Sequence, residues 1–576
     1  MIPSPSSRWR RIIGLLLHDK PRAIIAVLLL LAQGFAAAVA PRVLGYAVDS
    51  SSTNGVFVLA LIGCSYLGVE LIRIISARLQ AVEFSRIGQG AVHRLRIEAF
   101  HHVFSLPWGT IRRLGPSDLL SRLTVDIRSA SALFEACFLR IIERICGVVA
   151  IFLGIISLSV PVGLSVITLF PLLLLGAWYT SRRLYGAFHE RQTAIAAVTT
   201  SLADSIELTA ETKLLGLAAK RIDQFCAESN RLASVQKVPP LLFGRLHAGM
   251  SILSAIAVGA TLLLGERYIS AGLLTKGELI TLIAYMGSIM WPIIIIIDQW
   301  SVLLQGLASV DRIYELFGIP TEDAAVTQLS EQPQSHPQDG EQQTAITFRA
   351  VSFQYPETRR GVIDLSFTIH KGERIGIVGA TGSGKSTISR LILGLVSPDS
   401  GSISIGGAPI ATIPREKLRE MVAFMPQHPE MFSGTPLENI ILWDPHAEHF
   451  TKKITLLPES VVDLCTTDND AATSLSLGEQ QCIAALRILV RDPEIIVLDE
   501  PTAAIDPILE QWLMNTIFTP DSARTSLIIA HRLGTLERCD RIVMMKEGRI
   551  VDEGRHDELM QRSTAYRQVV EADARR

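Results

Sequence analysis

Six stretches in the first 320 residues are long enough and apolar enough to cross a bilayer as helices. They cover residues 23–40, 56–75, 132–158, 162–181, 246–264 and 279–304. A bilayer core takes about 20 apolar residues per helix. A single such stretch could be a buried helix of a soluble protein, but six in one half of a 576-residue chain favour an α-helical polytopic membrane domain. The mean hydropathy of +0.34 agrees with this.

Positive charges are distributed unevenly over the segments that join these stretches. The connections between the second and third stretches and between the fourth and fifth are long and rich in Arg and Lys, whereas the others carry only Arg42, Arg267 and Lys276. The positive-inside rule therefore places both termini in the cytoplasm, for a protein of the inner (cytoplasmic) membrane. A secretory signal is a second interpretation of the first stretch, although the run is long for a signal and further spans follow.

A few charged and polar residues interrupt the apolar stretches. Among them are Glu70, Arg73, Glu143, Arg144, Asp298 and Gln299. Ionisable groups at membrane depth usually pair with one another or face a cavity. The alternative is that these residues lie beyond the hydrocarbon, on helices that extend past the bilayer. The sequence supports both interpretations equally.

The composition changes sharply after residue 319. Residues 320–343 hold almost no large apolar residues and many Gln, Pro, Asp and Glu, which is typical of a solvated linker. We therefore expect a transmembrane domain at 1–319, a linker at 320–343 and an α/β domain at 344–576. The formal net charge of −2 gives no reason to expect nucleic-acid binding, and the seven scattered cysteines show no C-x-x-C spacing.

A glycine-rich loop follows an apolar strand at 375–378 and precedes a helical pattern at 388–395. The loop consists of Gly379, Ala380, Thr381, Gly382, Ser383, Gly384, Lys385, Ser386 and Thr387. Its glycines let backbone N–H groups turn toward phosphates, and the helix N-terminus adds positive potential. Lys385 is expected to reach the β- and γ-phosphates of ATP and the Ser386 hydroxyl to ligate Mg²⁺. The motif predicts a P-loop nucleotide-binding domain without saying which kind.

A second apolar strand, at 495–498, ends in Asp499 and Glu500. A buried strand can deliver Asp499 to the metal and Glu500 to the γ-phosphate, where a carboxylate can orient and deprotonate water. An apolar run that ends in two acidic residues is a weak signal alone, because many strands end in a solvated acidic turn. The P-loop upstream makes the catalytic interpretation much stronger.

The segment 475–481, shortly before this strand, completes a pattern. Its Ser476, Gly478 and Glu479 resemble the signature motif of ATP-binding-cassette (ABC) transporters. The order of a membrane half followed by a cassette resembles the exporters of that family. The resemblance implies an ABC-type P-loop NTPase domain after six transmembrane helices, with coupling helices near 108–117 and 205–213 that contact the cassettes.

The resemblance also assigns roles to four further residues. It implies that Tyr355 stacks on adenine and that Gln427 lies at the magnesium site with Ser386 and Asp499. It also implies that Asp506 lies in a loop at the dimer interface and that His531 contacts the γ-phosphate.

Two departures from the family pattern stand out. Leu477 replaces a usual glycine of the signature, and Gln480 and Cys482 replace common arginines. The segment between Gln427 and Ser476 is also shorter than is usual in exporters. Because Ser476 and Gly478 remain, we expect a working signature that contacts the γ-phosphate of a second subunit.

The resemblance implies ATP-driven export of a small amphipathic molecule, peptide or lipid, with ATP and Mg²⁺ as cofactors. One cassette cannot complete its own site, so a dimer with two ATP sites is expected. A homodimer is the first choice and a heterodimer with a paralogous half-transporter the second. A non-transporting ATP-binding scaffold and a membrane-tethered P-loop enzyme of another type are the alternatives, and Ser476 and Gly478 argue against the latter.

Overall fold

The computed structural model describes residues 14, 18–50, 55–134, 139–158, 160–322, 343–356, 358–442, 461–463, 475–501, 510–512, 514–515, 524–530 and 532–574. For 161–178 and for some other residues inside helices it describes the backbone alone. The chain divides into two compact units. One comprises Met1–Val103 and Ser117–Gly318, and the other Phe104–Pro116 and Ile319–Arg576. The predicted linker at 320–343 lies almost entirely outside the described residues.

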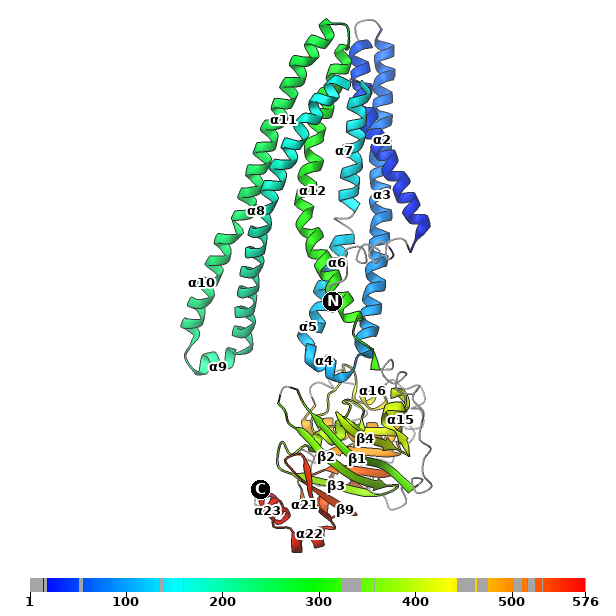
Figure 1. Ribbon diagram of the computed structural model, residues 1–576, viewed down its shortest axis with the longest axis vertical. Coiled ribbons are helices and arrows are strands. Elements are labelled where there is room, and N and C mark those ends of the chain that lie inside the picture. Colours follow the sequence, from blue (N-terminus) through cyan, green and yellow to red (C-terminus); the bar gives the residue numbers. More distant parts are fainter. Residues whose placement is uncertain are drawn as a thin grey trace. The chain divides into compact units, whose positions relative to one another are not determined.

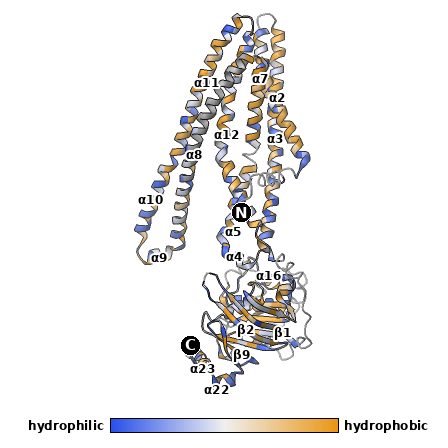
Figure 2. Cartoon of the chain, viewed as in Figure 1, coloured by the Kyte–Doolittle hydropathy of each residue, from blue (hydrophilic) through white to orange (hydrophobic). Residues whose placement is uncertain are grey.

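The first unit is built from long helices (Figure 1). They are α2 (Lys20–Ser50), α3 (Val56–Ser105), α5 (Pro116–Ser121), α6 (Ile127–Ala132), α7 (Leu139–Leu158), α8 (Val160–Glu207), α9 (Thr209–Leu214), α10 (Ala218–Gln236), α11 (Val238–Ser270) and α12 (Lys276–Phe317). Helices α8, α10 and α11 form a long hairpin with α9 at its tip, and this hairpin leans away from α2, α3 and α7. Hydrophobic residues predominate along α2 and α7, whereas hydrophilic residues are frequent along α10 (Figure 2).

Five helical segments among the described residues have the length and hydropathy of membrane spans. They are Lys20–Ser50, Val56–Ser105, Arg140–Leu158, Ala218–Ser270 and Lys276–Ile296. The remaining predicted span, 162–181, falls inside the helix α8. Most of the predicted third span, 132–158, coincides with α7, and residues 135–138 lie outside the described residues. With 50 residues, α3 is about 75 Å long, so much of it lies beyond a hydrocarbon core of about 30 Å.

Helices α2 and α12 approach each other closely at two glycines. A Cβ atom built on Gly45 would lie 2.4 Å from the Gly277 carbonyl oxygen, so only glycine fits there. The Asp49 carboxylate accepts hydrogen bonds from the Gly277 N–H at 2.8 Å and from the Thr275 hydroxyl at 2.6 Å. Because these groups form the N-terminus of α12, Asp49 ties the end of one helix to the start of another.

An ion pair between a buried carboxylate and an exposed guanidinium joins the π-helical turn η1 (Arg122–Asp126) to α12. The Arg312 guanidinium binds the Asp126 carboxylate through two hydrogen bonds, and the Nε–Oδ2 bond measures 2.9 Å. The Asp126 side chain is 2% exposed and that of Arg312 54% exposed. The two partners are therefore unequal, because only the carboxylate has lost its water.

This inequality predicts an asymmetric response to substitution. Arg312→Met should lower the free energy of unfolding by about 3 kcal/mol, because it leaves a buried carboxylate unpaired. Asp126→Asn should cost only about 1 kcal/mol, because the exposed guanidinium regains water. Thermal or denaturant unfolding of the intact protein in detergent measures both, with Arg86→Met, which removes an exposed pair with Glu83, as the control. Equal losses for the two variants would contradict this account.

The second unit contains two sheets and the short helix α4 (Trp108–Leu114). The antiparallel sheet has the order β2-β1-β4-β5, and the other has the order β10-β9-β3-β8-β7-β6. The strands are β1 (Thr344–Gln354), β2 (Gly361–His370), β3 (Arg374–Gly379), β4 (Ser400–Ile405), β5 (Ala408–Pro409), β6 (Val422–Met425), β7 (Ile495–Asp499), β8 (Thr525–Ile529), β9 (Arg541–Lys546) and β10 (Arg549–Gly554).

The six-stranded sheet positions the candidate site. Strands β3, β6, β7, β8 and β9 are parallel, and their residues form unbroken apolar runs because both faces of the sheet are covered. The carboxyl ends of parallel strands meet at one edge, so β3 and β7 carry the glycine-rich loop and the acidic pair to the same side.

Helices cover these strands. They are α14 (Lys385–Ile392), α15 (Arg415–Met421), α16 (Pro436–Ile441), α19 (Leu477–Arg491), α21 (Leu533–Leu536), α22 (His556–Arg562) and α23 (Thr564–Ala574).

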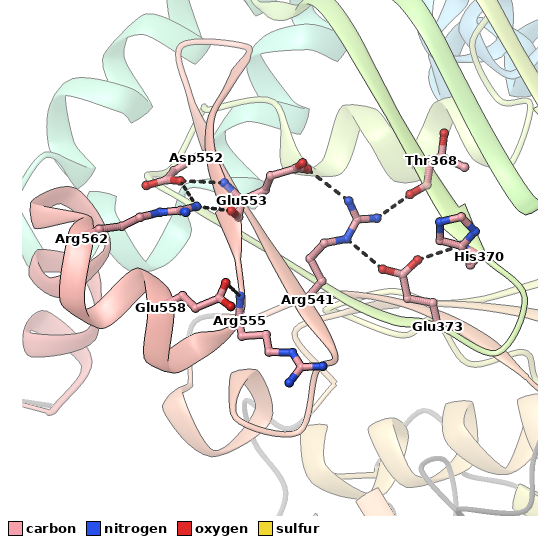
Figure 3. Close-up of polar contacts among 9 residues, drawn as sticks. All are labelled: Thr368, His370, Glu373, Arg541, Asp552, Glu553, Arg555, Glu558 and Arg562. Atoms are coloured by element: carbon pink, nitrogen blue, oxygen red, sulfur yellow. Dashed lines mark hydrogen bonds and ion pairs between the residues drawn. The ribbon is translucent and has the colours of Figure 1, made fainter.

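An arginine on β9 connects the two sheets (Figure 3). Arg541 donates to the Glu373 carboxylate at 2.8 Å, to the Glu553 carboxylate on β10 at 3.2 Å and to the Thr368 carbonyl on β2 at 2.5 Å. Glu373 in turn accepts from the His370 N–H at 2.7 Å. This network holds the antiparallel sheet against the strands that carry the site.

Candidate functional site

The glycine-rich loop lies between β3 and α14, as the sequence predicts. Gly382 and Gly384 have φ angles of +84° and +103°, which side-chain-bearing residues rarely adopt. A Cβ atom on Gly384 would also lie 2.8 Å from the Gly361 carbonyl oxygen. The chain can therefore turn into the helix N-terminus only with glycine at these positions.

The Lys385 side chain is held inside this loop. Its ammonium donates to the Gly379 carbonyl at 2.6 Å and to the Ala380 carbonyl at 3.2 Å. Burial lowers the pKa of Lys385, while the negative charges of Glu500 and Asp499 raise it. The loop is closed further by the Ser383 N–H, which donates to the Ala380 carbonyl at 3.0 Å.

Asp499 lies at the carboxyl end of β7, opposite the start of α14. The Ser386 hydroxyl donates to its carboxylate at 3.3 Å. Burial raises the pKa of Asp499 and the charge of Glu500 raises it further, whereas the Ser386 hydrogen bond and Lys385 lower it. Ser386 and Asp499 thus place a hydroxyl and a carboxylate oxygen together, which are the hard donors that Mg²⁺ prefers.

Glu500 follows in a left-handed backbone conformation, with φ of +49°. Such a conformation costs about 1 kcal/mol in a residue with a side chain and is typical of functional sites. Its carboxylate accepts a hydrogen bond from the Gln427 amide at 2.7 Å. Because a carboxylate only accepts, this bond orients the Gln427 NH₂ toward Glu500 and leaves the amide oxygen for another partner.

One cavity of about 340 Å³ collects these groups. It is lined by Tyr355, Arg360, Gly361, Thr381, Gly382, Gly384, Lys385, Ser386, Thr387, Gln427, Asp499 and Glu500. The cavity thus brings together most of the residues that the sequence predicts to bind the nucleotide and the metal, although Tyr355 and Asp499 are 144 positions apart in the chain. Arg360 and Gly361 were missed, because no motif marks them.

Tyr355 lies in a cluster of arginines and aromatic rings. Arg390 of α14 donates to its hydroxyl at 2.7 Å, and the Arg390 and Arg112 guanidinium carbons lie 5.6 and 5.7 Å from its ring centre. Arg390 also lies 5.3 Å from the Trp108 ring of α4, which belongs to the same compact unit. The sequence placed a coupling helix here by resemblance but assigned Arg112 and Arg390 no role, because no local pattern connects them with Tyr355.

The signature residues begin α19. The Ser476 hydroxyl accepts from the Glu479 N–H at 3.4 Å, and the Glu479 carboxylate accepts from the Ser476 N–H at 2.7 Å, which forms a capping box. Glu479 therefore has a structural role at the helix start. Neither Ser476 nor Gly478, both of which the structure describes, is among the residues that line the cavity of the same chain.

A buried glutamine links this helix to the cavity. The Gln481 amide donates to the Gln427 carbonyl at 3.0 Å. The neighbouring Cys482 is 1% exposed and packs in an apolar cluster with Ile440 and Leu486, which explains how this position accommodates an apolar side chain. The remaining predicted residues, Asp506 and His531, lie outside the described residues.

This combination of a membrane-spanning helical unit and a P-loop α/β unit defines a class of membrane-bound ATPases, and comparison with known proteins identifies the family. The model of the ABC transporter transmembrane region matches residues 23–293, and the ABC transporter model matches residues 362–503. The chain belongs to the ABC transporters, with both parts fused in one polypeptide. It is a multi-pass membrane protein of the exporter type that binds ATP and couples its hydrolysis to transport.

Relatives match along nearly the whole chain. The probable multidrug resistance ABC transporter ATP-binding/permease protein YheI of Bacillus subtilis (strain 168) is 27% identical, over 96% of this chain and 95% of its own length. The ATP-dependent lipid A-core flippase of Alcanivorax borkumensis is 26% identical, over 92% and 93%. The structure of a bacterial Atm1-family ABC exporter with ATP bound shares the fold, with a TM-score of 0.79 at 23% identity, over 96% of this chain and 97% of that one.

Proposed function

We propose that two copies of this chain together export a small amphipathic molecule, a peptide or a lipid, using two ATP molecules held between their cassettes. The observation that carries the proposal is the composition of the cavity. The P-loop, Asp499, Glu500 and Gln427 of one chain line it, but Ser476 and Gly478 do not. The signature of a second cassette would supply the missing donors to the γ-phosphate.

Residues on one side of the cavity bind ATP. The backbone N–H groups of the P-loop and the N-terminus of α14 surround the phosphates, and Lys385 neutralises the β- and γ-phosphates. Tyr355 stacks on the adenine. Ser386, Asp499 and the Gln427 amide oxygen hold Mg²⁺, which neutralises charge on the phosphates when bound. This donor set fits that ion, because all three donors are oxygen atoms, the hard ligands that Mg²⁺ prefers.

Glu500 performs the proton transfer. Its carboxylate, oriented by the Gln427 amide at 2.7 Å, accepts a proton from the water that attacks the γ-phosphate. By the family resemblance alone, we assign His531 a contact with the γ-phosphate and Asp506 a place in the loop at the dimer interface; both lie outside the described residues. With both ATP molecules bound the closed cassette pair is favoured, and hydrolysis releases it, which shifts the membrane helices between two arrangements.

The helical hairpin of the membrane unit supports the dimer. Leu214 and Leu215 follow each other at the tip near α9, and they are 86% and 69% exposed in the single chain. Adjacent exposed leucines at the end of a long hairpin suit a contact with another subunit. The tip overlaps the segment 205–213, for which the sequence predicts a coupling helix.

We also propose that the protein lies in the cytoplasmic membrane with both termini and the ATPase domain in the cytoplasm. The support is the excess of Arg and Lys in the two long connections. ATP is available on that side, so the orientation agrees with the site.

A mixed-dimer experiment tests the shared sites. Lys385→Ala and Gly478→Asp chains with different tags are co-expressed, and dimers holding one of each are purified. If each site combines the P-loop of one chain with the signature of the other, one site of the mixed dimer carries both substitutions and the other site carries neither. ATP turnover should then reach roughly half that of wild type for a C2 dimer. Either parent alone should be inactive. Mixed dimers as inactive as the parents would contradict sites shared between two copies.

A heterodimer with a paralogous half-transporter is the second candidate. Leu477, in place of the usual glycine, favours it, because paired half-transporters can divide one good and one altered site between them. Purified alone, the chain would then lack ATP turnover and regain it only with its paralogue.

A further inference from the structure

A second cavity, of about 470 Å³, lies within the membrane unit. Helices α2, α3, α7 and α12 contribute its lining. The charged and amide side chains in the lining are Gln33, Glu70, Arg73, Glu143 and Arg144. They include Glu70 and Arg73 of the second predicted span and Glu143 and Arg144 of the third, so the structure favours the cavity interpretation of these four groups.

The charged residues of this cavity form two ion pairs, and only one of them is joined by a hydrogen bond. Arg73 donates to Glu70 at 2.8 Å from the next turn of α3, which is a complete local pair. Arg144 lies next to Glu143 in the sequence, and neighbouring helical residues do not face each other. The closest approach of these two groups is accordingly 3.6 Å, and Glu143 instead accepts a hydrogen bond from the Gln33 amide at 2.9 Å.

Two buried polar atoms of the lining residues have no hydrogen-bond partner. They are the Gln33 amide oxygen and the Arg144 Nε. The bond to Glu143 determines the amide orientation, because a carboxylate can only accept, so the unpaired atom of Gln33 is an acceptor. A buried polar group without a partner destabilises the protein, because it has lost its hydrogen bonds to water. A molecule that brings both a hydrogen-bond donor and an acceptor would remove this destabilisation.

The surrounding side chains define the rest of such a molecule. The charges of the two carboxylates and the two guanidinium groups sum to zero. A ligand with a single charge is therefore repelled by two of these groups while it is attracted by the other two. Tyr66 and Trp291 add aromatic surface, which attracts alkylammonium groups. Leu30, Ala37 and Ile151 form an apolar part of the lining.

We infer that this cavity binds the zwitterionic polar end of an amphipathic substrate, with its cationic group at Glu143 and its anionic group at Arg144. The inference rests on the proposed export function and names the class of molecule that the membrane unit accepts. The alkyl part of the molecule lies along the apolar lining.

The test compares three probes with the same twelve-carbon chain on the full-length protein in lipid nanodiscs. N-Dodecylglycine is zwitterionic, dodecanoate is anionic and dodecylammonium is cationic, and both ammonium groups carry N–H donors for the Gln33 amide oxygen. Tritiated probes in a scintillation proximity assay give the dissociation constants, with empty nanodiscs subtracted. The wild type should bind the zwitterion at least tenfold more tightly than either singly charged probe.

Two charge-removing variants should change the preference in opposite directions. Glu143→Gln should lose tenfold or more in zwitterion affinity and gain relative affinity for dodecanoate. Arg144→Gln should instead gain relative affinity for dodecylammonium. Arg144→Lys, which keeps the charge, should keep the wild-type order of the probes. Glu83→Gln removes a comparable pair with Arg86 at 2.8 Å outside the cavity and serves as the matched control.

Equal affinities for the three probes, or the same order of probes in Glu143→Gln and Arg144→Gln as in the wild type, would overturn the inference. ATP turnover without probe is measured on the same samples. If the wild type hydrolyses ATP but binds the three probes regardless of their charge, only the zwitterion site is rejected. If the wild type does not hydrolyse ATP, the proposed export by two copies of this chain is rejected. If Arg144→Gln does not fold, the Glu143→Gln and Arg144→Lys pair still decides the question.

Discussion

Glu500→Gln should bind ATP as well as the wild type and lose at least about 100-fold in ATP turnover, because general-base catalysis contributes that much or more. Glutamine keeps the size of the side chain, and its oxygen can still accept the hydrogen bond that Gln427 donates at 2.7 Å. Only the charge and the basic oxygen disappear. Binding depends on Lys385 and the P-loop N–H groups, so the loss falls on the chemical step.

Single-turnover hydrolysis and ATP retention in nanodiscs measure this effect. Lys385→Ala is the complementary variant and should lose ATP binding itself. Glu494→Gln is the matched control, because Glu494 directly precedes β7 and lies outside the cavity. Wild-type turnover in Glu500→Gln would show that another group accepts the proton, and the scaffold alternative would then gain support.

Gly478→Asp should abolish ATP turnover while leaving the cassette folded. A carboxylate placed about 4 Å from the γ-phosphate of the other subunit repels it by roughly 4 kcal/mol at an effective dielectric constant of 20, which corresponds to about a 1000-fold loss. The same substitution does not harm the helix, because an acidic residue in the first turn of α19 interacts favourably with the helix dipole. Turnover should therefore fall without a fall in melting temperature.

Leu477→Gly is the partner experiment for the signature. Leu477 is the first residue of α19, and restoring the usual glycine should change ATP turnover less than threefold if the phosphate-facing donors are Ser476 and Gly478. A rise of orders of magnitude would mean that the natural signature is degenerate, and the heterodimer would become the leading proposal.

Local motifs were sufficient to predict the class of protein and much of the ATP-site lining. The P-loop lies between β3 and α14 and the acidic pair at the end of β7, because a strand, a turn and a helix start are each encoded by contiguous residues. Five of the six predicted spans coincide with helices of suitable hydropathy for the same reason. Span boundaries were less accurate, since apolar composition marks only part of a long helix, and α3 continues to Ser105, beyond the predicted span at 56–75.

The sequence alone determined which chemistry the chain carries: apolar helices for a bilayer, glycines and a lysine for phosphate, and carboxylates for metal and water. Only the tertiary structure decided which distant side chains meet. The Asp126–Arg312 pair spans 186 residues, Gln33 and Glu143 are 110 apart, and Gln427 and Glu500 are 73 apart. Such contacts depend on how helices and strands pack, which no local pattern encodes, so a single sequence shows the charged residues within the spans but not the cavity that they share.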